Sequence, residues 1–412
     1  MRKFKSLWLS ILFISGSHFL FAQAWTVFNS SNSLLPGNAV NSITIDTLGR
    51  KWIGTDFGIA VMADTGWAVL QTSNSGLPSN SVKCIAIDKQ GIVWIGTGSG
   101  GLAKFDGTNW RIYNHSNSGL STDNVAAIAF DTSGNKWIGT QAGLDFLRDT
   151  TWKEYTISNS LLFSDNIKSI VVNDSNIAYL GTLNGGFVTI RDTTFSIYTS
   201  SNSTMPDNTV LSLAIDSSGK KWMACPANGL VYNFDTFFYN YTPVNSQIQS
   251  YSFYAVAIDS LQNVYCGSIG SGLIKKSGLY FYQYSTLNSG IPDDYILSIT
   301  VERNGIIWLG TASAGLVRLN ESLLTGISNN IGFSDISVFP NPASAKIGIR
   351  GLGNHTMKLE LINISGEILS TLYHEEIKEN MTLDLSGFSP GVYHLKIIND
   401  ENVQVKKILK VD

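Results

Sequence analysis

Charged residues, cysteines and histidines are all scarce in this sequence, and each shortage excludes a class of function. Charged residues make up 14% of the 412 residues and the net charge is -3, which leaves no basic surface for nucleic acid or for an anionic membrane. The three cysteines, Cys84, Cys225 and Cys266, are too few and too scattered for a disulfide framework or a CxxC metal site. His115 is the only histidine between residues 25 and 334, which excludes a site with several histidine ligands there.

The common catalytic motifs are missing as well. No GxSxG elbow, HExxH zinc motif or P-loop occurs in the chain. The sequence therefore predicts no catalytic residues, no metal site and no cofactor, and it favours a binding protein over an enzyme. Apolar residues, by contrast, make up 43% of the chain, and Ser, Asn, Thr and Gly are abundant. That composition suits a large core beneath a neutral surface rich in hydrogen-bonding groups.

The N-terminus has the three parts of an export signal. Basic residues at positions 2, 3 and 5 precede a mostly apolar stretch from Leu7 to Phe21, and Ala22-Gln23-Ala24 supplies a cleavage pattern. The apolar stretch is shorter than the roughly 20 residues that span a bilayer, which disfavours the alternative of an uncleaved anchor helix. We therefore expect residues 1–24 to be a signal peptide, with no transmembrane span elsewhere.

A short motif of the form Trp-Ile-Gly-Thr recurs along the chain and organises most of it. The copies lie 42 or 43 residues apart and begin at Trp52, Trp94, Trp137, Tyr179, Trp222, Tyr265 and Trp308. An acidic residue or Asn stands six residues before each copy, and Gly, Asn or Gln stands three before it. Seven units in one register indicate a repeat protein.

Each repeat contains four short β-strands separated by turn residues. In the second repeat they are expected at 82–87, 93–97, 101–105 and 110–113, which we call strands A to D. The Asp-x-x-Gly signature predicts a tight A–B hairpin in which the carboxylate bonds backbone N–H groups and Gly takes a positive φ. Turn chemistry therefore accounts for Asp46, Asp88, Asp131, Asp216 and Asp259, in preference to a ring of catalytic acids. A period near 43 with four strands predicts an all-β, seven-bladed β-propeller.

The ends of this propeller are expected to join through its outer strands. The strand D pattern, two aromatics three apart followed by Asn, begins at Trp25, Trp67, Trp110, Trp152, Phe195, Phe238 and Phe281, with Leu70 replacing one second aromatic. The first copy precedes every strand A, and the last repeat has no copy after it. The segment Trp25–Phe28 should therefore be the outer strand of the last blade, which removes an exposed edge.

The repeats resemble the two-component regulator propeller family. The resemblance runs through residues 76–82, 91–97 and 100–102, covers residues 25 to about 320, and is weaker in the fourth and sixth repeats. That family commonly forms the periplasmic sensor of hybrid histidine kinases and recognises glycan fragments. No kinase region follows here, so the resemblance implies the fold and a ligand face, but not signalling.

Residues 335–412 do not follow the sequence pattern of the repeats. They come after a polar stretch at 321–334 that is typical of a linker. Short strands expected at 336–339, 346–349, 357–363, 382–385, 392–398 and 403–411 would form a small C-terminal β-sandwich. Residues 338–343, 365–367, 385–393 and 406–409 resemble the C-terminal sorting domain of type IX secretion. The resemblance implies recognition by the outer-membrane secretion and sorting machinery, and delivery through the periplasm and outer membrane to the surface or the medium. On composition alone, an accessory sandwich remains the alternative.

A ligand site is expected where the B–C loops and the D-to-A connections meet, at one mouth of the channel. Positions that are constant across the repeats serve the fold, so the variable positions on this face are the candidates. A column of Asp and Asn in the D-to-A connections is expected to bond its own loops. The candidate ligand-binding residues are the aromatics Phe57, Tyr251 and Tyr254, the donors Lys83 and Lys168, and the amides Gln141, Asn184 and Asn228.

The function expected from the sequence is a secreted or surface-attached module that binds a glycan or a protein. The alternatives are a polysaccharide-active hydrolase or lyase on the same scaffold and a purely structural adhesin. No arginine is expected on the ligand face, which argues against a lyase that must neutralise a uronate. Two carboxylates about 5 to 9.5 Å apart in a deep pocket would favour the hydrolase.

Overall fold

The computed structural model describes residues 24–234, 237–278, 280–324, 337–350, 357–363, 368–374, 380–399 and 403–411. The expected signal peptide, apart from Ala24, lies outside these residues, as does the expected linker beyond residue 324. Within the described residues the fold is all-β apart from one short 3-10 helix, which confirms the all-β part of the expected fold.

The strands of the repeats form seven four-stranded antiparallel sheets among the described residues, numbered here in chain order. Sheet 1 comprises β2 (Val40–Ile45), β3 (Lys51–Thr55), β4 (Gly58–Ala63) and β5 (Gly66–Leu70), and sheet 2 comprises β6 (Val82–Ile87), β7 (Val93–Thr97), β8 (Leu102–Phe105) and β9 (Trp110–Tyr113). Sheet 3 comprises β10 (Val125–Phe130), β11 (Lys136–Thr140), β12 (Leu144–Arg148) and β13 (Thr151–Tyr155), and sheet 4 comprises β14 (Ile167–Val172), β15 (Ala178–Thr182), β16 (Phe187–Arg191) and β17 (Thr194–Tyr198). Sheet 5 comprises β18 (Ser212–Ile215), β19 (Lys221–Ala224), β20 (Leu230–Phe234) and β21 (Phe237–Tyr241), and sheet 6 comprises β22 (Phe253–Ile258), β23 (Val264–Ser268), β24 (Leu273–Ser277) and β25 (Tyr280–Tyr284). Sheet 7 comprises β26 (Ile296–Val301), β27 (Ile306–Thr311) and β28 (Leu316–Asn320), together with β1 (Trp25–Phe28) from the start of the chain.

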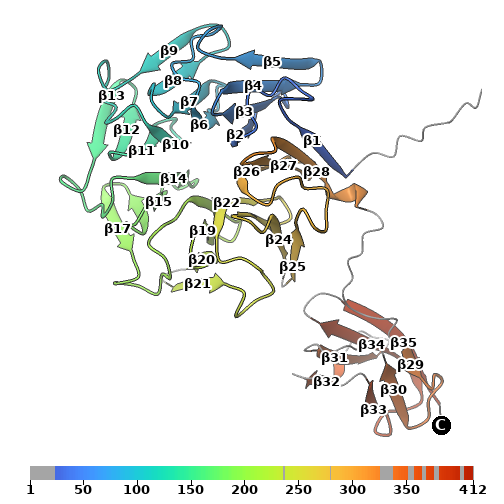
Figure 1. Cartoon of the computed structure of the whole chain (residues 1–412). Helices are drawn as coiled ribbons and strands as arrows, with labels where there is room; N and C mark the ends of the chain where they lie inside the picture. Colours follow the sequence, from blue (N-terminus) through green and yellow to red (C-terminus); the bar gives the residue numbers. More distant parts are fainter. Residues whose placement is uncertain are drawn as a thin grey trace, which may run out of the picture.

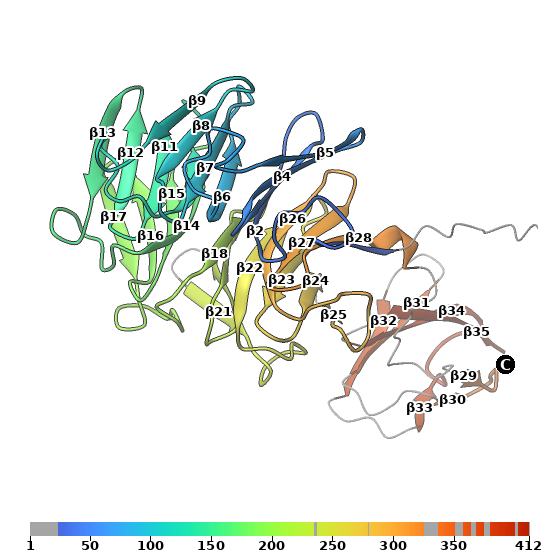
Figure 2. The same cartoon turned by 45° about the horizontal axis from the view of Figure 1, so that its top comes forward.

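The seven sheets form a closed ring around a central channel (Figure 1). Each innermost strand contacts the innermost strand of the next sheet, and β26 of sheet 7 contacts β2 of sheet 1. Apolar side chains fill the junctions between neighbouring sheets, so that Trp308 and Leu316 of sheet 7, for example, share one buried cluster with Val40 and Ile53 of sheet 1. The core is therefore distributed around the ring, between neighbouring sheets, whose strands Figure 2 shows from a second side.

The recurring Trp-Ile-Gly-Thr motif stabilises this packing through three separate contacts. The Trp52 indole N–H donates to Asp46, whose other carboxylate oxygen accepts the backbone N–H groups of residues 48 and 50. A Cβ on Gly54 would lie 2.6 Å from Val82 of the next sheet, so only glycine allows the sheets to approach. The Thr55 hydroxyl donates to the Gly58 carbonyl and caps the B–C turn.

The predicted closure by the N-terminal strand is confirmed. β1 pairs antiparallel with β28, from Trp25 opposite Leu319 to Phe28 opposite Leu316, and becomes the outer strand of sheet 7. A Cβ on Gly290 would meet Trp25 at 2.7 Å, as a Cβ on Gly76 would meet Trp110 of sheet 2. β1 therefore makes the same contact as an ordinary strand D.

The chain leaves the ring through a bonded segment. After β28 comes the 3-10 helix η1 (Glu321–Leu323), and the Glu321 carboxylate accepts bonds from Lys275 Nζ at 2.6 Å and from the hydroxyls of Tyr265 and Tyr284 at 3.0 and 3.2 Å. Burial raises the pKa of both tyrosines, and the charge and hydrogen bond of the Glu321 carboxylate raise it further. Residues 321–323 therefore contact the ring, although they fall in the segment that the sequence assigned to the linker.

The C-terminal region contains two sheets around one core. A three-stranded sheet, in the order β29-β30-β33, comprises β29 (Ser337–Phe339), β30 (Lys346–Arg350) and β33 (Asn380–Asp384), and a four-stranded sheet, in the order β32-β31-β34-β35, comprises β32 (Ile368–His374), β31 (Met357–Asn363), β34 (Gly391–Asn399) and β35 (Val403–Lys410). Side chains of both sheets share one buried apolar cluster. β32 was missing from the sequence prediction, although its run of seven residues is rich in apolar and β-branched side chains.

Candidate ligand-binding site

A β-bulge in the innermost strands directs one column of side chains into the channel. In six of the seven sheets the pairing of strand A with strand B skips one residue near the start of strand A. The skipped residues are Asn41, Lys83, Ala126, Lys168, Tyr254 and Leu297. A bulge leaves its extra residue unpaired and re-aims the side chain. The repeat therefore presents a variable column to the channel.

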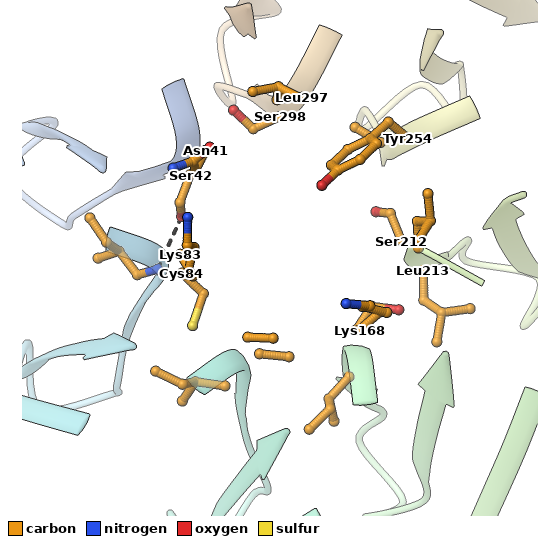
Figure 3. Close-up of a pocket in the computed structure, with 18 of the residues that line it drawn as sticks. Asn41, Ser42, Lys83, Cys84, Lys168, Ser212, Leu213, Tyr254, Leu297 and Ser298 are labelled. Carbon is orange, nitrogen blue, oxygen red and sulfur yellow. Dashed lines mark hydrogen bonds between the residues drawn. The ribbon is translucent and has the colours of Figure 1, made fainter. Parts of the chain in front are cut away.

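A cavity of about 700 Å³ occupies the channel at this level. Its wall includes the whole variable column, with Leu211 completing it in sheet 5, and the small or aliphatic residues that follow on each strand A. Gln141 and Leu183 add contacts from two B–C loops, which places the cavity at the mouth. Figure 3 shows Tyr254, Lys168 and Lys83 among the side chains around this space. The volume falls within the about 300 to 1,000 Å³ of ordinary ligand pockets.

The mouth is built by hydrogen bonds between each B–C loop and the following D-to-A connection. Gly58 N donates to the Asn80 carbonyl, and equivalent bonds join Gly186 to Asn208 and Gly229 to Tyr251. These bonds place both sets of loops at one end of the ring, as the sequence predicted. Side chains from loops far apart in the sequence can therefore reach one ligand.

Lys83 is neutralised by an acidic neighbour. Its Nζ lies 2.8 Å from the Asp56 carboxylate, which also accepts a bond from Asn41 Nδ2 at 3.0 Å. Partial burial alone would raise the pKa of Asp56, but the bonds from Lys83 and Asn41 and the Lys83 charge outweigh burial and hold the pKa below its usual value. Lys83 and Asp56 together thus contribute no net charge to the cavity.

Lys168 and Tyr254 have no such neutralising partner. Among the described residues, Lys168 Nζ has no hydrogen bond or ion pair, and partial burial lowers its pKa. The Tyr254 ring stands edge-on to Tyr295, with ring centroids 6.2 Å apart. Burial raises the pKa of Tyr254, and the nearby Tyr295 and Asp56 raise it further, so its hydroxyl stays protonated. The two side chains offer a cation, a hydroxyl and a flat ring to the same cavity (Figure 3).

The structure brings four of the eight predicted ligand-binding residues together. Lys83, Gln141, Lys168 and Tyr254 line the cavity. The remaining four lie in the loops of the same mouth but outside the cavity wall: Phe57, Tyr251, Asn184 and Asn228. The Phe57 ring is 61% exposed, and it lies against Gly37, where an added Cβ would approach it to 2.7 Å. The amide oxygen of Asn184 accepts a bond from the Thr209 hydroxyl.

The Asp and Asn column of the D-to-A connections has the expected structural role. Each such side chain accepts a bond from a backbone N–H eight residues earlier, at 2.7 to 2.9 Å, in Asn38, Asn80, Asp123, Asp165, Asn208 and Asp294. These bonds close the loop that carries the chain from one sheet to the next. In sheet 6 this position is Tyr251, which is 45% exposed.

The sequence reasoning missed a buried carboxylate. Asp145 stands on β12 at a position that is Ala60, Ala103, Val188, Val231, Ile274 or Val317 in the other sheets. Its Oδ2 accepts bonds from the backbone N–H and the hydroxyl of Ser121, both at 2.9 Å. Burial raises the pKa of Asp145 to about 6, although the Ser121 bonds oppose this shift. Proline or another residue replaces Ser121 in the other repeats. Comparing the Ser121 position and the Asp145 position across the repeats would therefore have shown that both change together in the third repeat.

Two protein families match parts of the chain. Residues 337–411 match the secretion system C-terminal sorting domain, and residues 76–99 match the two component regulator propeller. The chain carries a secretion sorting domain. This domain indicates secretion to the cell surface, and both resemblances expected from the sequence are confirmed. Throughout the described part of the chain, no helix is both long and apolar enough to cross a membrane.

Solved structures share the fold of this secreted chain but little of its sequence. The extracellular domain of a hybrid two component system from B. thetaiotaomicron is 20% identical, with a TM-score of 0.65 over 94% of this chain and 57% of that chain. PorZ, a surface component of the type IX secretion system of Porphyromonas gingivalis, is 17% identical, with a TM-score of 0.58 over 91% and 60%. Virginiamycin B lyase from Staphylococcus aureus is 12% identical, with a TM-score of 0.58 over 72% and 98%.

The chain therefore spans about three fifths of the length of the first two of these proteins. Identities this low show a common fold and carry no function by themselves. A search among curated proteins finds no match.

Proposed function

We propose that the protein is a secreted or surface-attached binding module whose ring is a seven-bladed β-propeller with a glycan site at the channel mouth. The supporting observation is the bulged innermost strand, which turns a variable column of the repeat into a cavity of about 700 Å³. The conserved columns, in contrast, are occupied by turn bonds and by contacts between sheets. A binding site is thus free to vary without disturbing the fold.

The domain plan follows the same proposal. Residues 1–24 are the signal peptide, and the propeller begins at residue 25 and extends beyond the expected limit of 320 to include η1. A linker follows, and residues 335–412 form a β-sandwich that the type IX secretion machinery recognises. Its two sheets and shared apolar core support a unit that folds independently of the ring.

The second candidate is an enzyme, a polysaccharide hydrolase or lyase on the same scaffold, because virginiamycin B lyase is an enzyme with a ring of this fold. The cavity wall argues against hydrolysis, since none of the described residues that line it is Asp or Glu. Glycoside hydrolysis ordinarily needs a carboxylate pair about 5 to 9.5 Å apart. A purely structural adhesin would have no use for an unpaired lysine and a tyrosine directed into one cavity.

A glycan array probed with the mature full chain tests the proposal. The wild type should bind a defined set of glycans, and Tyr254→Ala should weaken that binding about tenfold because it removes a stacking surface. Phe237→Ala is the matched control, since this aromatic is 58% exposed on the outer strand β21 and lies outside the cavity wall. An array without hits, or equal losses in both variants, would refute the proposed site. Binding of a protein at the same residues, with no glycan bound, would show that the ligand is a protein and not a glycan.

A further inference from the structure

The charge of the cavity narrows the class of ligand beyond the proposed function. The charged residues in the cavity wall are Lys83 and Lys168, and Asp56, which pairs with Lys83, lies just outside it. One positive charge therefore remains, and it belongs to Lys168. Removing a lysine from water without an acidic partner is unfavourable, and an anion placed beside it restores the lost stabilisation.

The closed ring limits how a ligand can enter. Seven innermost strands surround the cavity, so a polymer cannot cross the ring from side to side, and the end of a chain is the part that can enter. Tyr254 of sheet 6 points into the same space as Lys168 of sheet 4, with Ser212 of sheet 5 between them in the ring (Figure 3). A flat ring and a cation that face one cavity suit a sugar that has an apolar face for stacking and a carboxylate on its rim.

We propose that the cavity binds a uronic acid residue at the end of a glycan chain, with its carboxylate on Lys168 and its sugar ring against Tyr254. This inference rests on the proposed function and specifies the sugar. The absence of arginine noted from the sequence argues against a lyase, but it does not oppose binding, because a single lysine is sufficient to pair one carboxylate. The carboxylates of the mouth loops, such as Asp165 and Asp294, are bonded to backbone N–H groups of their own loops.

Calorimetric titration of the mature full chain with four probes tests the inference: a glucuronate-terminated oligosaccharide, its carboxyl-reduced counterpart, free glucuronate and inorganic phosphate. The wild type should bind the uronate-terminated probe about ten to one hundred times more tightly than the reduced one, as one charge-assisted bond predicts. Lys168→Met should abolish this preference, whereas Lys168→Arg should retain most of it. Lys89→Met, in an A–B turn at the opposite end of the ring, should match the wild type.

The outcomes separate the two proposals. Equal affinity of the wild type for both oligosaccharides would overturn the uronate inference and leave glycan binding intact. Binding of phosphate but of no sugar, lost in Lys168→Met, would identify a general anion site and overturn the sugar. Failure to bind any probe, together with an empty glycan array, would overturn the uronate inference and the proposed function alike.

Discussion

Removal of the first ring strand should destabilise the whole ring rather than one blade. The perturbation is deletion of Ala24–Asn32, which removes β1 and its pairing with β28. It also removes the Phe28 ring, whose centroid lies 6.1 Å from that of Trp308 and 5.6 Å from that of Trp67 in sheet 1. Phe28 therefore connects the last sheet to the first.

The size of the loss follows from burial. Trp25, Val27 and Phe28 are each partly buried, and a large side chain contributes about 1.5 to 3 kcal/mol when fully buried, so the three together contribute about 3 to 4 kcal/mol. The backbone bonds of β1 add about 1 kcal/mol each. The deletion should thus lower the free energy of unfolding by at least about 5 kcal/mol, a large share of the 5 to 15 kcal/mol of an ordinary domain.

Urea unfolding followed by tryptophan fluorescence measures this loss. The truncated protein should unfold at a much lower urea concentration, or fail to fold at all. Phe28→Ala should fold and lose about 2 to 3 kcal/mol. Thr26→Ala, on the same strand, should stay within about 0.5 kcal/mol of the wild type. An unchanged unfolding midpoint after deletion of the strand would refute the closure argument.

Three further predictions concern stability and export. Burial raises the pKa of Asp145 from 3.8 in the unfolded chain to about 6 in the folded protein. The stability that the protonated carboxyl provides is therefore complete below pH 3.8 and is lost as the pH rises through about 6. Asp145→Asn should therefore raise the free energy of unfolding by about 3 kcal/mol near pH 8 and by little near pH 4 in urea titrations; an equal effect at both pH values would contradict this. Asp88→Ala should cost about 1 to 3 kcal/mol by the same assay because it leaves the Trp94 indole N–H without its acceptor, and unchanged stability would refute the turn role. Without residues 335–412 the ring should keep its melting temperature but accumulate in the periplasm, and surface delivery would argue against the sorting role.

The repeat residues made the fold predictable because they act locally and identically in each unit. Asp88 and Trp94 lie six residues apart and meet across one hairpin, so their spacing alone defines the turn. The closing strand was predictable for the same reason, since Trp25 repeats the pattern of Trp110 and makes the same contact with a glycine. Such short-range constraints remain visible in a single sequence.

The details of the site depend on contacts that one sequence does not reveal. A bulge moves a side chain to the other face of its strand. The alternation of side chains along strand A therefore could not show by itself that Lys168 points into the channel. Asp145 is bonded to Ser121, which lies 24 residues earlier in the connection that leads into the same sheet, and only a comparison of the two columns links them. Glu321 likewise contacts Lys275 through the fold, which is why the polar segment after β28 was assigned to a linker.

The most direct test of the central claim is hydrogen–deuterium exchange of the mature protein with and without a glycan identified by the array. The account predicts slower exchange on binding at the start of β14 and β22, around residues 166–169 and 251–254, where the bulges present Lys168 and Tyr254 to the cavity. The outer strands and residues 337–411 should exchange as they do in the free protein. Protection confined to the outer strands or to the C-terminal region would contradict a binding site at the channel mouth.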